Sequence, residues 1–166
     1  MSYSQSTGAL AVLILSAGFL PLASASPREA LDSMAGFWTG PGSIEFDQGA
    51  SEALMCKAYY ATADQAQRLS IVLRCASRSN RIELRAKLAL QGTKLAGTWE
   101  ERTFNAQGTA AGEVKEREIT MSVDGGGFTA TMLVTQEGSY QNVSITTQGT
   151  GFKTVNVSLS RGDDHD

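Results

Sequence analysis

The sequence predicts an all-β protein: an antiparallel up-and-down meander of about eight or nine strands that closes into a barrel, preceded by one short helix. Apolar and polar side chains alternate along nearly the whole chain after residue 36, which is typical of half-buried strands. Turn signals rich in glycine and asparagine separate these stretches at short intervals. Strands adjacent in sequence must therefore pair in space, and closure would remove the unpaired edges of the sheet.

Residues 1–25 have the features of a signal peptide. Ala9–Leu20 is a short apolar run, and Ala23-Ser24-Ala25 is an A-x-A cleavage site. The run is shorter than the roughly 20 residues that span a bilayer, so we expect a periplasmic or secreted protein that does not span a membrane. No Lys or Arg precedes the run, which leaves an overestimated start site as an alternative.

The chain from residue 26 to 161 is long enough for a single β-barrel domain with its own core. Pro27 to Met34 is the one segment expected to be helical, with proline near its start. Residues 162–166 are an acidic segment that we expect to be a disordered tail. Alternation predicts nine strand segments, at residues 37–46, 52–61, 68–77, 81–90, 95–104, 111–123, 127–136, 140–147 and 152–161.

Strand registers follow from the rule that inward positions must face inward positions. A turn at Gly92-Thr93 sets Leu90 opposite Leu95, and a glycine turn at 125–126 sets Val123 opposite Phe128. We therefore expect two consistent hairpins.

One stretch breaks this rule. Val114 belongs inward, opposite Trp99, yet Ile119 has the opposite parity. A bulge or strand break is therefore predicted near residues 115–117. Because a closed antiparallel meander needs an even number of strands, we expect one of the nine segments to lie outside the barrel or to be divided, either at this place or at Gly40-Pro41-Gly42.

The two cysteines are expected to form a disulfide. A hairpin centred near Asp64 and Gln65 sets Cys56 opposite Cys75, where Cβ atoms are close enough for the bond. Such a bond persists in an exported protein. Two free buried thiols are the alternative.

A short motif resembles the G-x-W signature of lipocalins and the wider calycin superfamily: Gly36-Phe37-Trp38 follows the expected helix and opens the first strand. In that superfamily a basic residue at the end of the last strand packs across the tryptophan, and Arg161 has this place here. The resemblance implies a lipocalin-like β-barrel with a Trp38–Arg161 stack, which cation–π attraction would stabilise.

The same start is similar to that of bacterial metalloprotease inhibitors, which are small periplasmic barrels with a disulfide. That resemblance implies a second function, in which residues 26–35 or a loop are presented to a secreted protease. It is an alternative to ligand binding.

The sequence offers little material for catalysis. His165 is the only histidine and lies in the terminal acidic segment, so a histidine-based catalytic centre is not expected. Two cysteines without a nearby histidine do not form a plausible zinc site, and no phosphate-binding loop is present. We expect no catalytic residue, no metal, no cofactor and, with a net charge of −3, no nucleic-acid partner.

Glu101 is the acidic residue that most needs an explanation. Its parity places it on the inward face with Trp99, where a carboxylate without a partner is costly. We favour a position near the barrel mouth, where the side chain reaches water. If it points inward, it would hold the polar end of a ligand more readily than act as a catalyst.

The favoured function is that of a non-enzymatic binding barrel for a small apolar ligand, since many inward positions are Ala, Gly or Val. A core simply filled by the inward side chains is the alternative. The predicted ligand-binding residues are Tyr60, Leu73, Leu84, Leu88, Trp99, Glu101, Met121, Phe128 and Met132.

Basic residues are concentrated in one part of the chain. Residues 57–94 contain eight Lys and Arg against two Asp and Glu. The expected registers place Glu83 between Arg74 and Arg102 on the outer face, and we expect alternating charges to neutralise much of this surface. An anionic partner, such as a lipid head group or a polysaccharide, is the alternative.

Overall fold

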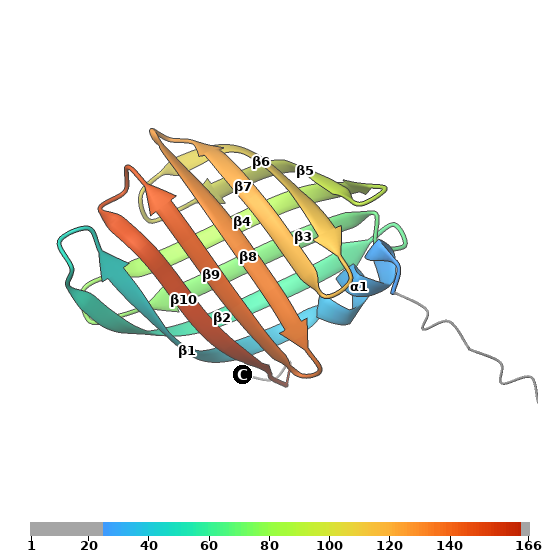
Figure 1. Cartoon of the computed structure of the whole chain (residues 1–166), viewed down its shortest axis with the longest axis horizontal. Helices are drawn as coiled ribbons and strands as arrows, with labels where there is room; N and C mark the ends of the chain where they lie inside the picture. Colours follow the sequence, from blue (N-terminus) through green and yellow to red (C-terminus); the bar gives the residue numbers. More distant parts are fainter. Residues whose placement is uncertain (1–24, 164–166) are drawn as a thin grey trace, which may run out of the picture.

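The computed structural model describes residues 25–163, which form one helix and ten antiparallel strands wound into a closed barrel (Figure 1). The helix is α1 (Pro27–Met34). The strands are β1 (Gly36–Phe46), β2 (Ser51–Ala63), β3 (Arg68–Ala76), β4 (Arg81–Gln91), β5 (Lys94–Glu101), β6 (Ala106–Lys115), β7 (Glu118–Gly125), β8 (Phe128–Glu137), β9 (Tyr140–Gln148) and β10 (Phe152–Arg161). Each strand pairs with its neighbours in sequence, and β10 pairs with β1. The predicted all-β meander with one N-terminal helix is confirmed.

The predicted ends of the chain fall largely outside the described residues. Residues 1–24 of the predicted signal peptide and residues 164–166 of the predicted tail are not among the described residues. Gly162, the first residue of that tail, donates its N–H to the Phe37 carbonyl at 3.0 Å. Gly162 is therefore joined to the barrel. Within residues 25–163, no helix is long and apolar enough to cross a bilayer.

The predicted count of eight or nine strands is wrong, because the segment 111–123 contains parts of two strands. A tight turn at residues 116–117 separates β6 from β7, at the place where a break was expected. The turn sets Val114 opposite Ile119, and both side chains are buried. A chain reversal between two residues of opposite parity allows both side chains to point inward.

One hairpin register is confirmed and another is corrected. Leu90 pairs with Leu95 as predicted. Val123 pairs with Ala130 rather than with Phe128, because the turn is formed by residues 126–127, both glycines with positive φ, instead of 125–126. The shift is two residues, so the same side chains still point inward.

The prediction that Val114 faces Trp99 is also wrong. The loop of residues 102–105 is short, so β6 begins at Ala106 and brings Gly108 opposite Trp99. A Cβ at Gly108 would lie 1.9 Å from the Asp124 carbonyl oxygen, so the close approach of β7 requires glycine here.

The disulfide between Cys56 and Cys75 is present, and the two residues pair directly across β2 and β3. The bond closes a local loop with a sequence separation of 19 residues. It therefore stabilises one hairpin and its register, mainly by restricting the unfolded chain.

The helix closes one end of the barrel, and we call this the closed end (Figure 1). Ser26 caps α1: its hydroxyl accepts the Glu29 N–H at 3.3 Å, and the Glu29 carboxylate accepts the Ser26 N–H at 2.7 Å. The buried side chains of the helix are Ala30, Leu31 and Met34. The short amphipathic helix thus covers the end at which β1 begins.

The predicted stack of Arg161 on Trp38 lies beside α1. The guanidinium carbon lies 4.3 Å from the centre of the Trp38 ring, and Arg161 also donates to the Ala35 carbonyl at 2.7 Å and the Ser33 carbonyl at 2.5 Å. The Trp38 indole N–H donates to the Met34 carbonyl at 2.9 Å. Because the last four carbonyls of a helix lack partners within it, these bonds join the end of α1 to both β1 and β10.

Candidate ligand-binding site

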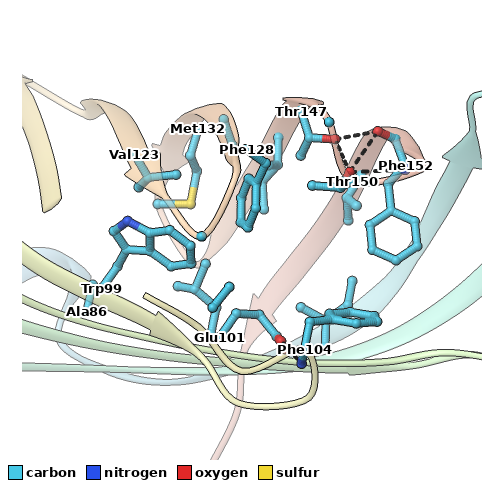
Figure 2. Close-up of a pocket in the computed structure, with 18 of the residues that line it drawn as sticks. Ala86, Trp99, Glu101, Phe104, Val123, Phe128, Met132, Thr147, Thr150 and Phe152 are labelled. Atoms are coloured by element: carbon cyan, nitrogen blue, oxygen red, sulfur yellow. Dashed lines mark hydrogen bonds between the residues drawn. The ribbon is translucent and has the colours of Figure 1, made fainter. Parts of the chain in front are cut away.

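A cavity of about 270 Å³ lies at the opposite end of the barrel, which we call the open end. The loops of residues 47–50, 77–80, 102–105, 126–127 and 149–151 surround this end. The cavity is lined by Ile82, Leu84, Ala86, Trp99, Glu101, Phe104, Ala106, Met121, Val123, Gly126, Phe128, Ala130, Met132, Ile145, Thr147, Gly149, Thr150, Phe152 and Val155. Figure 2 shows most of these side chains.

Small inward residues leave the space that the cavity occupies. Ala86, Ala106 and Ala130 all point into the open end. At the closed end the corresponding interior is filled by larger side chains, such as Leu69, which is fully buried. The cavity therefore results from side-chain volume at particular positions, because the backbone of the closed barrel is continuous around both ends.

Aromatic rings form the deeper part of the cavity. Trp99 and Phe128 lie 5.1 Å apart between ring centres, with their planes tilted by 60°, and Figure 2 shows both beside Met132. The Trp99 indole N–H donates to the Asp124 carbonyl at 3.2 Å. The indole is thus held in place while its ring faces the cavity, where it would contact a ligand.

A second aromatic group lies at the mouth. Phe152 lies 5.7 Å from Phe46 and 5.6 Å from Phe104, measured between ring centres. Phe104 is 53% exposed although it lines the cavity. An exposed aromatic side chain at an opening offers apolar surface both to an entering ligand and to solvent.

The two hydroxyl groups of the cavity are already hydrogen-bonded. Thr147 and Thr150 lie 2.8 Å apart between their Oγ1 atoms, and both donate to the Phe152 carbonyl (Figure 2). The Phe152 N–H in turn donates to Thr150 at 3.0 Å. These contacts stabilise the loop between β9 and β10, and few polar groups remain for a ligand.

Glu101 does not reach water as predicted, because it is only 7% exposed. One carboxylate oxygen accepts the Glu83 N–H at 2.7 Å, and the other accepts the Phe104 N–H at 2.6 Å. Backbone N–H groups compensate the desolvation of a buried carboxylate. Glu101 therefore links β4 to the loop of residues 102–105, although its side chain also lines the cavity.

The structure brings six of the nine predicted ligand-binding residues together. Leu84, Trp99, Glu101, Met121, Phe128 and Met132 line the cavity. Tyr60, Leu73 and Leu88 are buried but are not among the lining residues. Their parity is inward as expected, and all three side chains pack in the core beside or beyond the cavity; Leu73 directly neighbours the lining residue Leu84.

Two important lining residues were not predicted, because the alternation of side chains stops where each is found. Phe104 follows the end of β5 and lies in a loop. Phe152 has the parity of outward residues, but the register of β1 and β10 shifts between Glu45 and Phe46. This irregularity turns Phe152 inward, opposite Phe46.

Comparisons with known proteins address the fold. No protein-family profile matches the chain, and its sequence has no significant match among curated proteins. Among solved structures it is similar to Rv2717c from M. tuberculosis, with a TM-score of 0.67, 12% identity, and coverage of 85% of this chain and 100% of that one. It is also similar to the S-type phycobiliprotein lyase CPES from Guillardia theta, with a TM-score of 0.58, 13% identity, and coverage of 86% and 95%.

The barrel here has ten strands, and at these levels of identity the similarity to both structures concerns the fold alone. The resemblance suggested by Gly36-Phe37-Trp38 is thus supported at the level of the fold.

Proposed function

We propose that this protein is an exported, non-enzymatic binding protein whose barrel accepts a small apolar ligand through the open end. The main support is the cavity of about 270 Å³ with its largely apolar lining. Its polar groups, Thr147, Thr150 and Glu101, already have partners within the protein. The polar groups of a polar ligand would therefore find few free partners in the cavity and would stay without hydrogen bonds. An apolar ligand fits best. Export is supported by the signal-peptide features of residues 1–25.

The cavity volume limits the size of the ligand. An apolar cavity of about 150 Å³ accommodates benzene, and larger ligand pockets commonly range from about 300 to 1,000 Å³. A cavity of about 270 Å³ therefore suits a short aliphatic chain or a compound of one or two rings.

A binding function is favoured over an enzymatic one by the positions of the acidic groups. Within the part of the chain that the structure describes, Glu101 is the one carboxylate that lines the cavity, and both of its oxygens accept hydrogen bonds from backbone N–H groups. Glycoside hydrolysis requires two suitably placed carboxyl groups. One structural neighbour is named as a lyase, so the fold by itself does not decide this point and the argument depends on the site.

Tryptophan fluorescence provides a direct test, because the chain has only two tryptophans and they lie at opposite ends of the barrel. Trp99 lines the cavity, whereas Trp38 stacks on Arg161 at the closed end. The protein and its Trp99→Phe variant would be titrated with medium-chain fatty acids and with one- and two-ring aromatic compounds. We expect a saturable change in emission that is absent from the Trp99→Phe variant.

Calorimetry on the same samples separates the loss of binding from the loss of the reporter. We expect the Trp99→Phe variant still to give a heat of binding, since phenylalanine keeps most of the apolar surface that residue 99 presents to the cavity. A fluorescence change that persists without Trp99 would place binding outside the cavity. The absence of any heat or fluorescence change across the panel would refute the proposal.

The alternative of a protease inhibitor receives less support. Residues 26–35 include α1, whose Leu31 and Met34 are buried against the barrel. A protease could not take this segment into its active site without opening the closed end.

A further inference from the structure

The outer surface of β2–β5 has a concentration of positive charge that the cavity does not explain. Two outward cations on these strands are paired with carboxylates of neighbouring segments, Arg68 with Asp64 and Lys94 with Glu113. The other outward cations on these strands, or directly after them, include Lys57, Arg74, Arg81, Arg85, Lys87 and Arg102. We call this set the basic wall. The carboxylates on the same surface are Glu83 and Glu100. The basic wall is thus strongly positive on a protein whose net charge is −3.

The register places these charges beside one another. Lys57 lies opposite Arg74, and Arg74 lies opposite Glu83. The Arg102 N–H donates to the Glu83 carbonyl at 3.0 Å, which continues the same row across the next strand. The cations therefore form a contiguous surface, because adjacent strands in a sheet are only about 4.8 Å apart.

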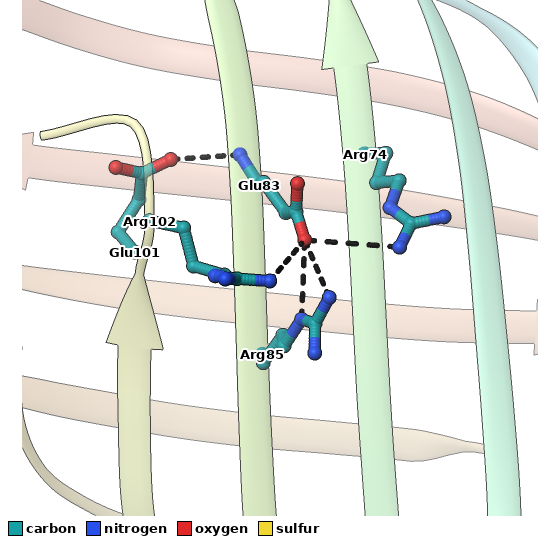
Figure 3. A network of polar contacts seen from close by, with 5 residues as sticks. All are labelled: Arg74, Glu83, Arg85, Glu101 and Arg102. Carbon is teal, nitrogen blue, oxygen red and sulfur yellow. Dashed lines mark hydrogen bonds and ion pairs between the residues drawn. The ribbon is translucent and has the colours of Figure 1, made fainter. Parts of the chain in front are cut away.

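One carboxylate faces three guanidinium groups in this row (Figure 3). Oε1 of Glu83 lies 2.7 Å from Arg85, 3.5 Å from Arg102 and 3.7 Å from Arg74. The pKa of Glu83 is lowered mainly by the hydrogen bond from Arg85, and the charges of all three arginines lower it further. A single negative charge cannot neutralise three positive ones, so the predicted neutralisation by alternating charges is only partial.

The remaining wall charges are not neutralised by other ion pairs among residues 25–163. Glu100 faces Arg85 in the register, yet no ion pair joins them. Lys57 lies over the Phe37 ring at 5.7 Å, which leaves its charge in place. Positive charge therefore exceeds negative charge on this surface at neutral pH.

The opposite wall of the barrel has a different composition. Outward positions of β8, β9 and β10 include Thr131, Asn142, Thr146, Asn156 and Ser158. These side chains are uncharged. Positive charge is therefore concentrated on one side of the barrel, and that side would face an anionic partner.

We propose that the basic wall binds an anionic lipid bilayer. Exposed apolar side chains lie among its charges: Met55 and Tyr59 flank Lys57 on β2 and are 57% and 49% exposed, and Phe104 follows Arg102 closely at the mouth. A bilayer provides head-group charge for the cations and an interfacial region for these apolar groups. An anionic polysaccharide or an acidic protein in solution provides the charge without that region.

Vesicle sedimentation tests this binding with two matched variants. The wall variant is Lys57→Gln/Arg74→Gln/Lys87→Gln, which leaves Arg85 and Arg102 beside Glu83. The control variant is Lys115→Gln/Arg117→Gln/Lys153→Gln, whose cations lie on β6, in the turn between β6 and β7, and on β10, away from the basic wall. Both variants change the net charge equally. All proteins would begin at Ser26, which keeps α1 and the ten strands and excludes the apolar run Ala9–Leu20.

The protein is expected to bind vesicles of phosphatidylcholine that contain about 30% phosphatidylglycerol and not vesicles of phosphatidylcholine alone, with weaker binding at about 0.5 M salt. The wall variant should bind at least about tenfold more weakly. The control variant should change by less than about twofold. Circular dichroism checks that each variant is folded, and Lys57→Gln/Lys87→Gln replaces a wall variant that does not fold.

Three outcomes would overturn the proposal. The absence of binding to anionic vesicles would refute the proposal directly. An equal loss in the wall and control variants would assign binding to overall charge. Binding to soluble dextran sulfate without binding to vesicles would identify the partner as a polyanion in solution.

Discussion

The two ends of the barrel use the same strands and differ in how their interiors are filled. At the closed end, α1 buries Leu31 and Met34, and Trp38 is held between the helix and Arg161. At the open end, no helix formed by residues 25–163 covers the interior, and alanines leave a cavity beside Trp99. Protein interiors are close-packed when side chains fill them. The difference indicates that the closed end contributes more to stability and that the open end is available for a ligand.

Truncating the two tryptophans tests this difference with the largest expected effect. Trp38→Ala should lower the free energy of unfolding by about 3–5 kcal/mol, because Trp38 is fully buried and its N–H bonds the end of α1. Trp99→Ala should cost about 1–2 kcal/mol less, since one face of Trp99 borders empty space. Urea unfolding, monitored by circular dichroism, measures the free energy of unfolding of both variants. Equal costs would mean that the open end is packed as tightly as the closed end.

Enlarging two alanines tests the same difference from the other direction. Ala58→Leu should destabilise the protein by about 1–3 kcal/mol, because Ala58 is buried opposite Trp38. Ala130→Leu should leave stability unchanged within about 1 kcal/mol, because Ala130 borders the cavity, and it should abolish ligand binding. Thermal unfolding and calorimetric titration are the measurements. If Ala130→Leu unfolds the protein, the cavity is too rigid or too small for the proposed ligand.

The smallest expected effect concerns alkaline pH. Tyr60 is buried opposite Gly36 at the closed end, and burial raises the pKa of its phenol. Since the pKa is higher in the folded protein, the stabilising contribution is complete below the unfolded value of about 10 and is lost as pH rises above it.

Above pH 10 the free energy of unfolding should therefore fall by at most about 1.4 kcal/mol per pH unit through Tyr60. The Tyr60→Phe variant should lack this part of the slope. Tyr140→Phe is the matched control, because Tyr140 is 65% exposed. Identical slopes in the protein and in Tyr60→Phe would contradict the assignment.

Several features of the fold could be predicted because they depend on local alternation. The inward face of most strands follows from residue parity, which is why Cys56 could be placed opposite Cys75. The position of Arg161 beside Trp38 was instead predicted from the resemblance of Gly36-Phe37-Trp38 to the lipocalin motif. Parity also indicated a bulge or strand break near residues 115–117, where the structure has the turn between β6 and β7. The error of two residues at Gly126-Gly127 shows the limit of this method, since a shift by two leaves parity unchanged.

The site was predictable only in part. Six of the nine predicted residues line the cavity, because an inward position is necessary for lining it. Tyr60, Leu73 and Leu88 satisfy the same condition, yet neighbouring side chains cover them and they do not line the cavity. Parity indicates whether a side chain points into the barrel or out of it. It does not indicate where inside the barrel the side chains leave a cavity.

The sequence by itself determined the strand-forming pattern, the turns, the inward face and the disulfide, because each depends on residues that are near in sequence or directly opposed in one hairpin. Only the tertiary structure decided the closure of β10 onto β1, the sealing of one end by α1 and the inward turn of Phe152. It also decided that Glu101 is buried between Glu83 and Phe104. These features depend on contacts between segments that are distant in the sequence. Which side chains fill the interior, and which backbone groups they bond, is decided only when the barrel closes.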